Sequence, residues 1–417
     1  MEDSRRNYIS FIWHAVFLSI TVTFTEVNSV IPAMILQVGG GEIHVGIVTA
    51  IMIGVPLIAQ LNFTGLLHGR PRKKPFLLLG IALRVLSLGF IAVTLLLIDR
   101  FSVLQALLII YGELLLFTIS GAFAGMAYVY LVGKSFSPEL RARFFTRKQL
   151  ISSVGILVSA VIARQVLSSL SYPATYATLF AAAAAVLLTA SFGFWMIREK
   201  PVQVSGRKGY LATLRSLPAV LKKDPNLRTY LFFTNAMGFH VALTPFYVAL
   251  AGQKYTLDPR LAGNLLFFQI IGMVLASLFW PRIVKSAGFK GILRFWSVLS
   301  ILLPPLALVT AWFLPLPVYL GIFLFTGATI SARKVSQEAV IVELSTEENR
   351  ILYTGILGTL NLSIVIFPVL LGGLIRFTGY TPVFLGVACM SVGALYFLKR
   401  LNCPVDMRKL PPNREMP

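Results

Sequence analysis

The stretch "GLLHGRPRKKPFLLLG", residues 65–80, places four basic residues between two long apolar runs. These runs cover about residues 45–67 and 75–98, and each is long enough to cross a hydrocarbon layer about 30 Å thick as a helix of about 20 residues. A short basic loop between two such runs is typical of a chain that crosses a membrane and turns back. The stretch therefore predicts membrane-spanning helices.

The rest of the chain extends this pattern. Of its 417 residues, 57% are hydrophobic and 13% are charged, and its mean hydropathy of +0.80 lies outside the range of soluble globular proteins. The runs are continuous and do not alternate with period two, which excludes membrane-spanning strands. The sequence thus predicts an all-α membrane protein with twelve transmembrane helices. Their approximate spans are 8–37, 45–67, 75–98, 102–133, 148–169, 174–197, 228–251, 260–283, 291–312, 315–344, 351–375 and 382–399.

The basic residues are distributed asymmetrically over the predicted loops. The net charge is +21, and 29 of the 37 Lys and Arg fall in one set of alternate loops and tails. This bias matches the positive-inside rule and predicts that both termini are cytoplasmic, in the cytoplasmic (inner) membrane. The charge is then a topology signal beside anionic lipids on the inner face, and nucleic acid is not an expected partner. The opposite face carries Arg100, Arg164, Lys254, Arg260 and Arg376.

A basic central segment divides the helices into six and six. Leucines in residues 211–221 recur at helical spacing, which favours an amphipathic segment on the inner leaflet, and a loosely structured linker is the open alternative. The predicted domains are an amino-terminal bundle at 1–197, a cytoplasmic linker at 198–227, a carboxy-terminal bundle at 228–400 and a cytoplasmic tail at 401–417.

The two halves of the chain resemble each other. "SFSPELRARF" (135–144) follows the fourth run and "LSTEENRILY" (344–353) follows the tenth, with Arg141 aligned with Arg350. The basic loops after the second and eighth runs lie about 216 residues apart, and each opening run contains an asparagine, Asn28 and Asn235. This internal repeat predicts two pseudo-symmetric six-helix bundles.

This layout resembles the major facilitator superfamily, whose loop after helix two is roughly G-x-L-x-D-R-x-G-R-K. The chain matches that pattern except that Gly69 replaces the acid and Arg72 replaces a glycine. Its "PELRARF" segment is similar to the family's P-E-x-R-x-R loop. The sequence motifs typical of sugar porters and of drug antiporters are absent. Their absence makes these two subfamilies less favoured but excludes neither. By this resemblance, the expected gating residues are Gly65, Arg70, Lys73, Lys74, Glu139, Arg141, Arg143 and Arg350.

Charged residues inside the predicted helices indicate a site. A charge at the bilayer centre costs about 2.5–3.5 kcal/mol on insertion scales, so it is rarely left facing lipid. At 1.5 Å per residue, Arg333 lies about 18 Å from the cytoplasmic end of its helix, and Glu26 and Glu113 lie about 20 Å and 16 Å from the outer ends of theirs. In "GATISARKVSQEAVIVEL" (327–344), the polar residues cover an arc of about 140°, opposite Ala332, Val335, Ala339 and Val342. The six residues are Glu26, Arg84, Glu113, Arg333, Lys334 and Glu338.

The resemblance implies that helices one, four, seven and ten line a central cavity. Arginine binds carboxylate or phosphate bidentately, so helix ten is expected to recognise an anionic group. The alternative is structural pairing of Lys334 with Glu338 and of Arg333 with Glu26. Glu26 is the first candidate for proton coupling and Glu113 the second; Arg84 is expected to be structural. The predicted substrate-binding residues are Asn28, Asn235, Tyr247, Arg333, Lys334, Gln337, Glu338 and Asn361.

The sequence therefore predicts a secondary active transporter, monomeric in function, that moves a small anionic or zwitterionic solute by alternating access, with proton coupling. Two alternatives stay open: an exporter or flippase of amphiphiles, and a non-transporting receptor or scaffold. No enzyme, metal or cofactor motif is present in the sequence, so none is expected. Solute, direction and stoichiometry are not predicted.

Overall fold

The protein is all-helical, as predicted. The computed structural model describes residues 2–59, 70–136, 138–199, 218–345 and 350–402, and within these ranges there are helices and turns but no strand. Ten helices in the described ranges are long and apolar enough to cross a membrane. The predicted fold class is therefore confirmed at the level of membrane-spanning helices.

Breaks and mergers explain why ten spans correspond to twelve predicted runs. The run at 260–283 and the run at 291–312 both lie in one span, Pro259–Phe313, in which Gly288 has a non-helical φ of +63°. The run at 228–251 is divided at Thr244 and Pro245 into two shorter helices, because proline lacks the N–H that would continue the ladder. Ten spans thus account for eleven runs, and the divided helix accounts for the twelfth.

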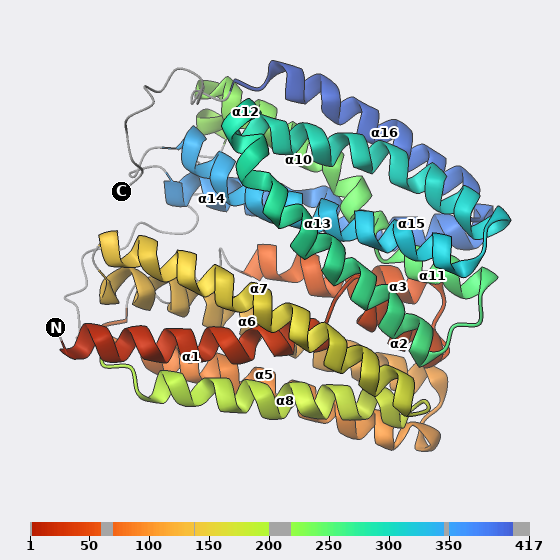
Figure 1. Cartoon of the computed structure of the whole chain (residues 1–417), viewed down its shortest axis with the longest axis horizontal. Helices are drawn as coiled ribbons and strands as arrows, with labels where there is room; N and C mark the ends of the chain where they lie inside the picture. Colours follow the sequence, from red (N-terminus) through yellow and green to blue (C-terminus); the bar gives the residue numbers. More distant parts are fainter. Residues whose placement is uncertain (1, 60–69, 137, 200–217, 346–349, 403–417) are drawn as a thin grey trace. The chain divides into compact units, whose positions relative to one another are not determined.

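The described helices of the amino-terminal half, apart from the segment Gly41–Ala50, belong to the first of two compact units, which comprises Met1–Gly40, Ile51–Tyr210 and Asp258–Gly263. Within it, α5 packs against α6 and α8, and α1 packs against α7 and α8 (Figure 1). The helices are α1 (Glu2–Phe24), α2 (Val30–Gln37), α5 (Lys74–Leu96), the short η2 (Ile98–Arg100), α6 (Val103–Ser135), α7 (Pro138–Ser169) and α8 (Ala174–Trp195).

The second unit comprises Gly41–Ala50, Leu211–Leu257 and Asn264–Pro417. Here α10 packs against α15 and α16, and α3 packs against α15. The helices are α3 (Glu42–Thr49), α10 (Pro225–Leu243), α11 (Phe246–Lys254), α12 (Pro259–Phe313), α13 (Leu316–Leu344), α14 (Arg350–Thr359), α15 (Leu362–Thr378) and α16 (Tyr380–Arg400). The π-helical turn η1 (Ala50–Gly54) follows α3 and passes into the first unit at Ile51.

The units do not follow the predicted domain boundaries residue by residue, since α3 belongs to the second unit and the start of α12 to the first. The domain limits at 197 and 228 stay a prediction. Of the predicted linker, residues 200–217 lie outside the described ranges, and residues 218–223 are helical.

The internal repeat is visible in how the start of α1 and the start of α10 each bind the backbone after the last helix of their own unit. In the first unit, the Asn7 side chain donates to the carbonyl of Arg198 at 3.1 Å and accepts the Arg198 N–H at 3.0 Å. In the second unit, the Asn226 side chain donates to the carbonyl of Asn402 and accepts the Asn402 N–H at 3.0 Å. Each asparagine thus forms a two-point contact with the backbone just after the final helix of its own unit.

A pair of lysines repeats in the same way. The Lys74 ammonium donates to the carbonyls of Trp195 and Ile197, both at 2.8 Å. The Lys290 ammonium donates to the carbonyls of Lys399 at 3.4 Å and Leu401 at 2.7 Å. Cations at a helix C-terminus satisfy carbonyls that have no intrahelical partner. The two loops that the sequence aligns thus make equivalent contacts.

Candidate functional site

Helix α13 carries the predicted polar stripe. Arg333 and Gln337 are half-buried and Lys334 is exposed, whereas Ala332, Ser336 and Val340 are fully buried. The buried side is therefore centred near Ser336. The predicted apolar side differs, because Val335 and Ala339 are only half-buried. Of Glu338 and Val342, the structure describes the backbone but not the side chains.

Close packing against α12 fixes the orientation of α13. A Cβ added at Gly272 would collide with the Leu324 carbonyl, and one added at Gly327 would collide with the Gln269 carbonyl. The two helices thus touch backbone to backbone, as small residues allow in membranes. The Trp280 indole N–H also donates to the Ser331 hydroxyl at 2.9 Å. These contacts leave the Arg333 side of α13 turned away from α12.

Arg333 has a polar neighbour on α10 of the second unit. The His240 ring on α10, itself 1% exposed, lies close enough to Arg333 for the two groups to interact electrostatically. Whether Arg333 and Lys334 contact a solute or form the structural pairs named above stays a prediction.

Glu26 lies in a break between α1 and α2. Its carboxylate accepts the Asn28 backbone N–H at 2.6 Å, the Asn28 side-chain amide at 2.8 Å and the Ser29 hydroxyl at 3.0 Å. Its carbonyl accepts the N–H groups of Val30 and Ile31, both at 3.1 Å. The carboxylate therefore holds the turn just before α2, while the carbonyl accepts the first N–H groups of the helix. Glu26 and Asn28 are brought together, as a local cap.

Glu113 faces α5 within the first unit. One of its carboxylate oxygens accepts the Thr94 hydroxyl at 2.8 Å, and the other is buried without a hydrogen-bond partner in the described part of the chain. The Ser87 hydroxyl donates to the Glu113 carbonyl. Glu113 is thus positioned by the contact between α5 and α6.

Asn235 and Asn361 meet at the break between α14 and α15. The Asn235 amide donates to the carbonyls of Leu231 and Leu360, both at 3.0 Å, and its oxygen accepts the Ser363 N–H at 3.3 Å. The Asn361 side-chain oxygen accepts the Ser363 hydroxyl at 3.1 Å. Asn235 therefore uses both ends of its amide to hold interrupted backbone, a role that sequence spacing does not reveal.

Tyr247 is fully buried on α11. Its carbonyl accepts the Tyr319 hydroxyl at 2.6 Å, while its own hydroxyl has no hydrogen-bond partner among the residues that the structure describes. Its ring packs edge-on against Phe384, with centroids 5.5 Å apart. Tyr247 is thus closely packed, and its predicted contact with a solute stays a prediction.

The predicted gating lysines are bound to Glu199. The Glu199 carboxylate accepts the backbone N–H groups of Lys73 and Lys74 at 2.8–2.9 Å and so caps α5. The Lys73 ammonium lies over the Tyr130 ring at 4.8 Å. Burial lowers the pKa of Lys73 below its usual value, against the opposing effect of Glu199, while Lys134 adds to the lowering.

For the other predicted gating residues, the structure describes the side chains of some and not of others. The Arg70 guanidinium is 5.7 Å from the centre of the Phe76 ring, and Arg143 is exposed. Gly65 lies outside the described residues. The backbones of Glu139, Arg141 and Arg350 are helical, and their side chains lie outside the description.

Sequence reasoning missed Glu199. The signal for it was an acid directly after the sixth run in an otherwise basic linker, "REKPVQ". It also did not predict the contact between Tyr128 and Lys148, whose ammonium lies 5.0 Å from the centre of the Tyr128 ring. Both are single polar residues at helix-compatible spacing, and no local pattern distinguishes them.

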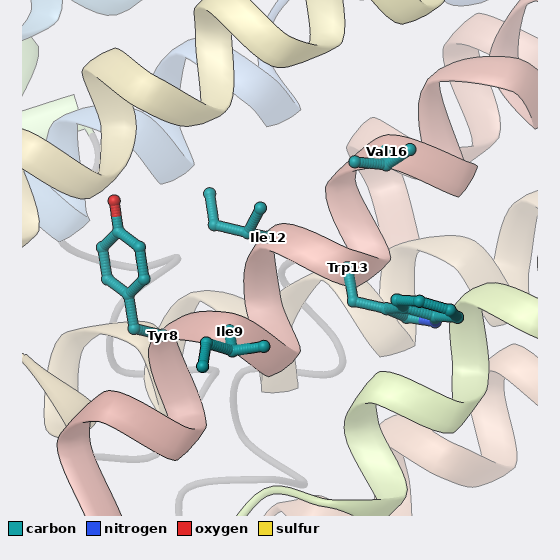
Figure 2. A pocket seen from close by; sticks show the side chains of 5 residues that line it. All are labelled: Tyr8, Ile9, Ile12, Trp13 and Val16. Atoms are coloured by element: carbon teal, nitrogen blue, oxygen red, sulfur yellow. The ribbon is translucent and has the colours of Figure 1, made fainter.

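A cavity of about 240 Å³ lies beside α1 and is not at any of these positions. Figure 2 shows that Tyr8, Ile9, Ile12, Trp13 and Val16 line it. The Tyr8 ring lies 5.7 Å from Phe144 of α7, and the Trp13 N–H donates to the Thr189 carbonyl of α8 at 2.9 Å. The lining is therefore apolar apart from the polar ends of Tyr8 and Trp13.

Comparison with known proteins identifies the family. A family model described as MFS/sugar transport protein matches residues 67–344. No curated protein matches the chain.

Solved structures of transporters share the fold. A mutant of the nucleoside transporter NupG superposes with a TM-score of 0.70 at 12% identity, over 96% of this chain and 99% of that one. A POT family transporter in complex with 5-aminolevulinic acid gives a TM-score of 0.66 at 10% identity, over 96% of each chain. The human organic anion transporter MFSD10 (TETRAN) gives a TM-score of 0.60 at 17% identity, over 95% of this chain and 99% of that one. At these identities the likeness concerns the fold.

The family match covers more than half of the chain, the transporter structures align along nearly all of it, and its helices are long and apolar enough to cross a membrane repeatedly. This chain is a multi-pass integral membrane protein that belongs to the MFS/sugar transport family of the major facilitator superfamily.

Proposed function

We propose that the protein is a secondary active transporter for a small anionic or zwitterionic solute, bound by the cationic side of α13. The observation that carries this proposal is the placement of Arg333 and Lys334 on the less buried side of a membrane span whose other side is packed. Two cations on such a surface are costly against lipid, so a wet cavity is the favourable environment. A carboxylate or phosphate group would complement their charge.

Other predicted residues support this arrangement indirectly. Gln337 lies one turn after Arg333 on the same half-buried side and offers a neutral hydrogen-bonding group to a zwitterion. Glu338, Asn28, Asn235, Tyr247 and Asn361 remain proposed solute contacts. Protons are the proposed coupling ion. Glu26 is the first proton site and Glu113, one of whose oxygens has no partner in the described ranges, is the second.

The membrane setting of the proposal follows the charge asymmetry. Both termini are placed on the cytoplasmic side of the inner membrane, with anionic lipids beside the basic loops and the monomer as the functional unit. The loop residues Lys73 and Lys74, the P-E-x-R-x-R segment and Arg350 are the proposed inner gate.

An amphiphile exporter is the second candidate. The apolar hollow beside α1 favours it, because it is open at the surface, with Ile9 and Trp13 exposed, and its lining complements an acyl or aromatic group. The cations of α13 favour the first candidate, since a purely apolar solute offers them no opposite charge.

Binding and counterflow separate the candidates. Purified protein is first screened by thermal shift against carboxylates, organophosphates and amphiphilic cations, because a ligand of the folded state raises the apparent melting temperature. The stabilising anion is then used for counterflow in proteoliposomes. Arg333→Gln and Lys334→Gln are each expected to reduce counterflow at least about tenfold, equivalent to about 1.4 kcal/mol of solute binding.

Lys254→Gln is the matched control, because that ammonium lies 6.0 Å from the centre of the Trp312 ring, near the end of α11, outside the proposed site. It should retain full counterflow. Undiminished transport by both α13 variants, or stabilisation by amphiphilic cations alone, would overturn the anion proposal.

A further inference from the structure

The hollow beside α1 is an open apolar surface of the first unit. Figure 2 shows that its five lining side chains all project from α1. Ile9 is 55% exposed and Trp13 is 43% exposed, so the hollow is accessible from outside the unit. On a helix that spans a membrane, such a surface can receive a hydrocarbon chain.

The hollow follows the strip of α1 that lies between its contacts with two neighbouring helices. On one side, the Tyr8 ring packs edge-on against Phe144 of α7, with centroids 5.7 Å apart. On the other side, the Trp13 indole N–H donates to the Thr189 carbonyl of α8 at 2.9 Å. These contacts hold both aromatic side chains in place, so the hollow between α7 and α8 is preformed.

Two arginines lie at the end of this strip. Helix α1 is continuous from Glu2 to Phe24, so spacing along the sequence gives position around its axis. Spacings of four, three and four residues place one stripe within an arc of about 60°. Its members are Arg5, Ile9, Ile12 and Val16. The next residue, Arg6, borders the stripe on the side of α8, and the apolar strip thus continues into a pair of cations.

The arginines lie at the level expected for lipid phosphates. The apolar span in α1 is Arg5–Phe24, so Arg5 is its first residue. At 1.5 Å per residue, Ile9 is about 6 Å and Val16 about 16 Å further along the helix. Basic side chains at the end of a span lie among the headgroups, and apolar side chains within the span lie among acyl chains. The arginines and the hollow therefore match the two parts of one phospholipid.

The charge at this end of the unit favours an anion. Arg5 is exposed and Arg6 is half-buried, and the Arg6 Nε has no hydrogen-bond partner among the described residues. The Asn7 side chain binds the backbone of Arg198, which brings a third arginine to the same end of the unit. Clusters of basic residues beside a membrane span attract anionic lipids.

Acids also lie at this end of the unit. The Glu199 carboxylate is engaged by the backbone N–H groups of Lys73 and Lys74. Glu2 and Asp3 precede the arginines on α1, and their side chains lie outside the description. A bound headgroup would compete with these two acids, so the experiment includes a variant without them.

We propose that an anionic phospholipid binds the first unit with one acyl chain in the hollow and its phosphate beside Arg5 and Arg6. Arginine binds phosphate oxygens bidentately, and the apolar lining complements the chain. A zwitterionic lipid offers the same chain, but its own cation opposes the arginines. This inference goes beyond the proposed function, because the lipid stays bound to the protein and its site uses no residue of α13.

Native mass spectrometry of the full-length protein tests the headgroup. Detergent-purified protein is titrated with phosphatidylglycerol and with phosphatidylcholine of the same chains, and the unsubstituted protein is expected to retain phosphatidylglycerol preferentially. The double variant Arg5→Gln, Arg6→Gln is expected to bind it at least about tenfold more weakly. Ile9→Trp, which fills the hollow at an exposed position and keeps both arginines, is also expected to weaken binding.

Arg400→Gln is the matched control, because it removes a cation from the end of another span, where the guanidinium lies 4.3 Å from the centre of the Tyr396 ring. It should leave retention unchanged. The double variant Glu2→Gln, Asp3→Asn should retain at least as much phosphatidylglycerol. Equal retention of the two lipids, or retention that does not depend on Arg5 and Arg6, overturns the proposal. A lipid-free dimer in the same spectra also overturns it, because a second copy would then cover the strip.

Fluorescence tests the position of the acyl chain. Bromine on a lipid chain quenches an indole that it contacts, and Trp13 is one of five tryptophans in the chain. Brominated phosphatidylglycerol is expected to quench the unsubstituted protein more than brominated phosphatidylcholine does. Trp13→Phe should abolish that difference. If the difference persists in Trp13→Phe, the chain does not lie in the hollow and the site is wrong.

Discussion

At the residue scale, the structure gives Glu26 a local hydrogen-bonding role beside the proton-coupling role that we propose for it. The sequence predicts a carboxylate near the middle of the first run, and the structure adds that the helix breaks there and that the carboxylate accepts three hydrogen bonds at the start of α2. A capping role and a proton-coupling role make different demands on the same side chain. A substitution that keeps its shape can distinguish them.

Glu26→Gln is expected to lower the free energy of unfolding by about 1–2 kcal/mol, because the amide nitrogen cannot accept the N–H groups at the break. Thermal unfolding in detergent measures this change, and Asp99→Asn, at an exposed carboxylate, is the control. If Glu26 also carries the coupling proton, the variant loses uptake driven by a pH gradient and keeps solute exchange. If uptake by Glu26→Gln still follows the pH gradient, Glu26 does not carry the coupling proton. That result would not affect its capping role.

At the element scale, the orientation of α13 depends on two glycines that face each other's helix backbone. Gly272→Ala is expected to destabilise the protein by about 1–3 kcal/mol, because the new methyl group would overlap the Leu324 carbonyl and force the two helices apart. Gly321→Ala on α13 is the control, since nothing lies within 4 Å of a Cβ there in the described structure. Equal unfolding temperatures for the two variants would falsify the close packing of α12 and α13.

Local sequence patterns predicted the elements better than the interruptions within them. The lengths of the apolar runs were enough to locate the helices. In lipid, a spanning segment must form hydrogen bonds between its own backbone groups, and a helix does this. The break after Phe24 was not predicted, since it depends on Glu26 and Ser29 replacing backbone partners. The break at Thr244 contains Pro245, and a proline alone does not predict a break, because membrane helices tolerate it.

At the scale of the whole molecule, the repeat was predictable and its contacts were not. Alignment of the two basic loops anticipated that they would be equivalent, but it did not anticipate that Lys74 and Lys290 would each bind carbonyls after the last helix of their own unit. Likewise, the sequence singled out Arg84 as a buried charge with a structural role, but not its place over the Phe117 ring beside Gly121, because these residues come near it only through folding. Long-range convergence of single polar residues carries no local signal.

The equivalence of the two lysines can be measured. Lys74→Met and Lys290→Met are each expected to lower the free energy of unfolding by about 1 kcal/mol, since each removes a cation from helix-terminal carbonyls while keeping an apolar stem. The double variant should lose the sum, because the two ammonium groups share no partner in the described structure and substitutions without shared partners are additive. Thermal unfolding of the unsubstituted protein, the two single variants and the double variant in one detergent completes a double-mutant cycle. Lys285→Met, at an exposed lysine of the second basic loop, is the control. If only one of the two single variants is destabilised, the lysines are not equivalent and the repeat does not extend to the contacts that close each unit.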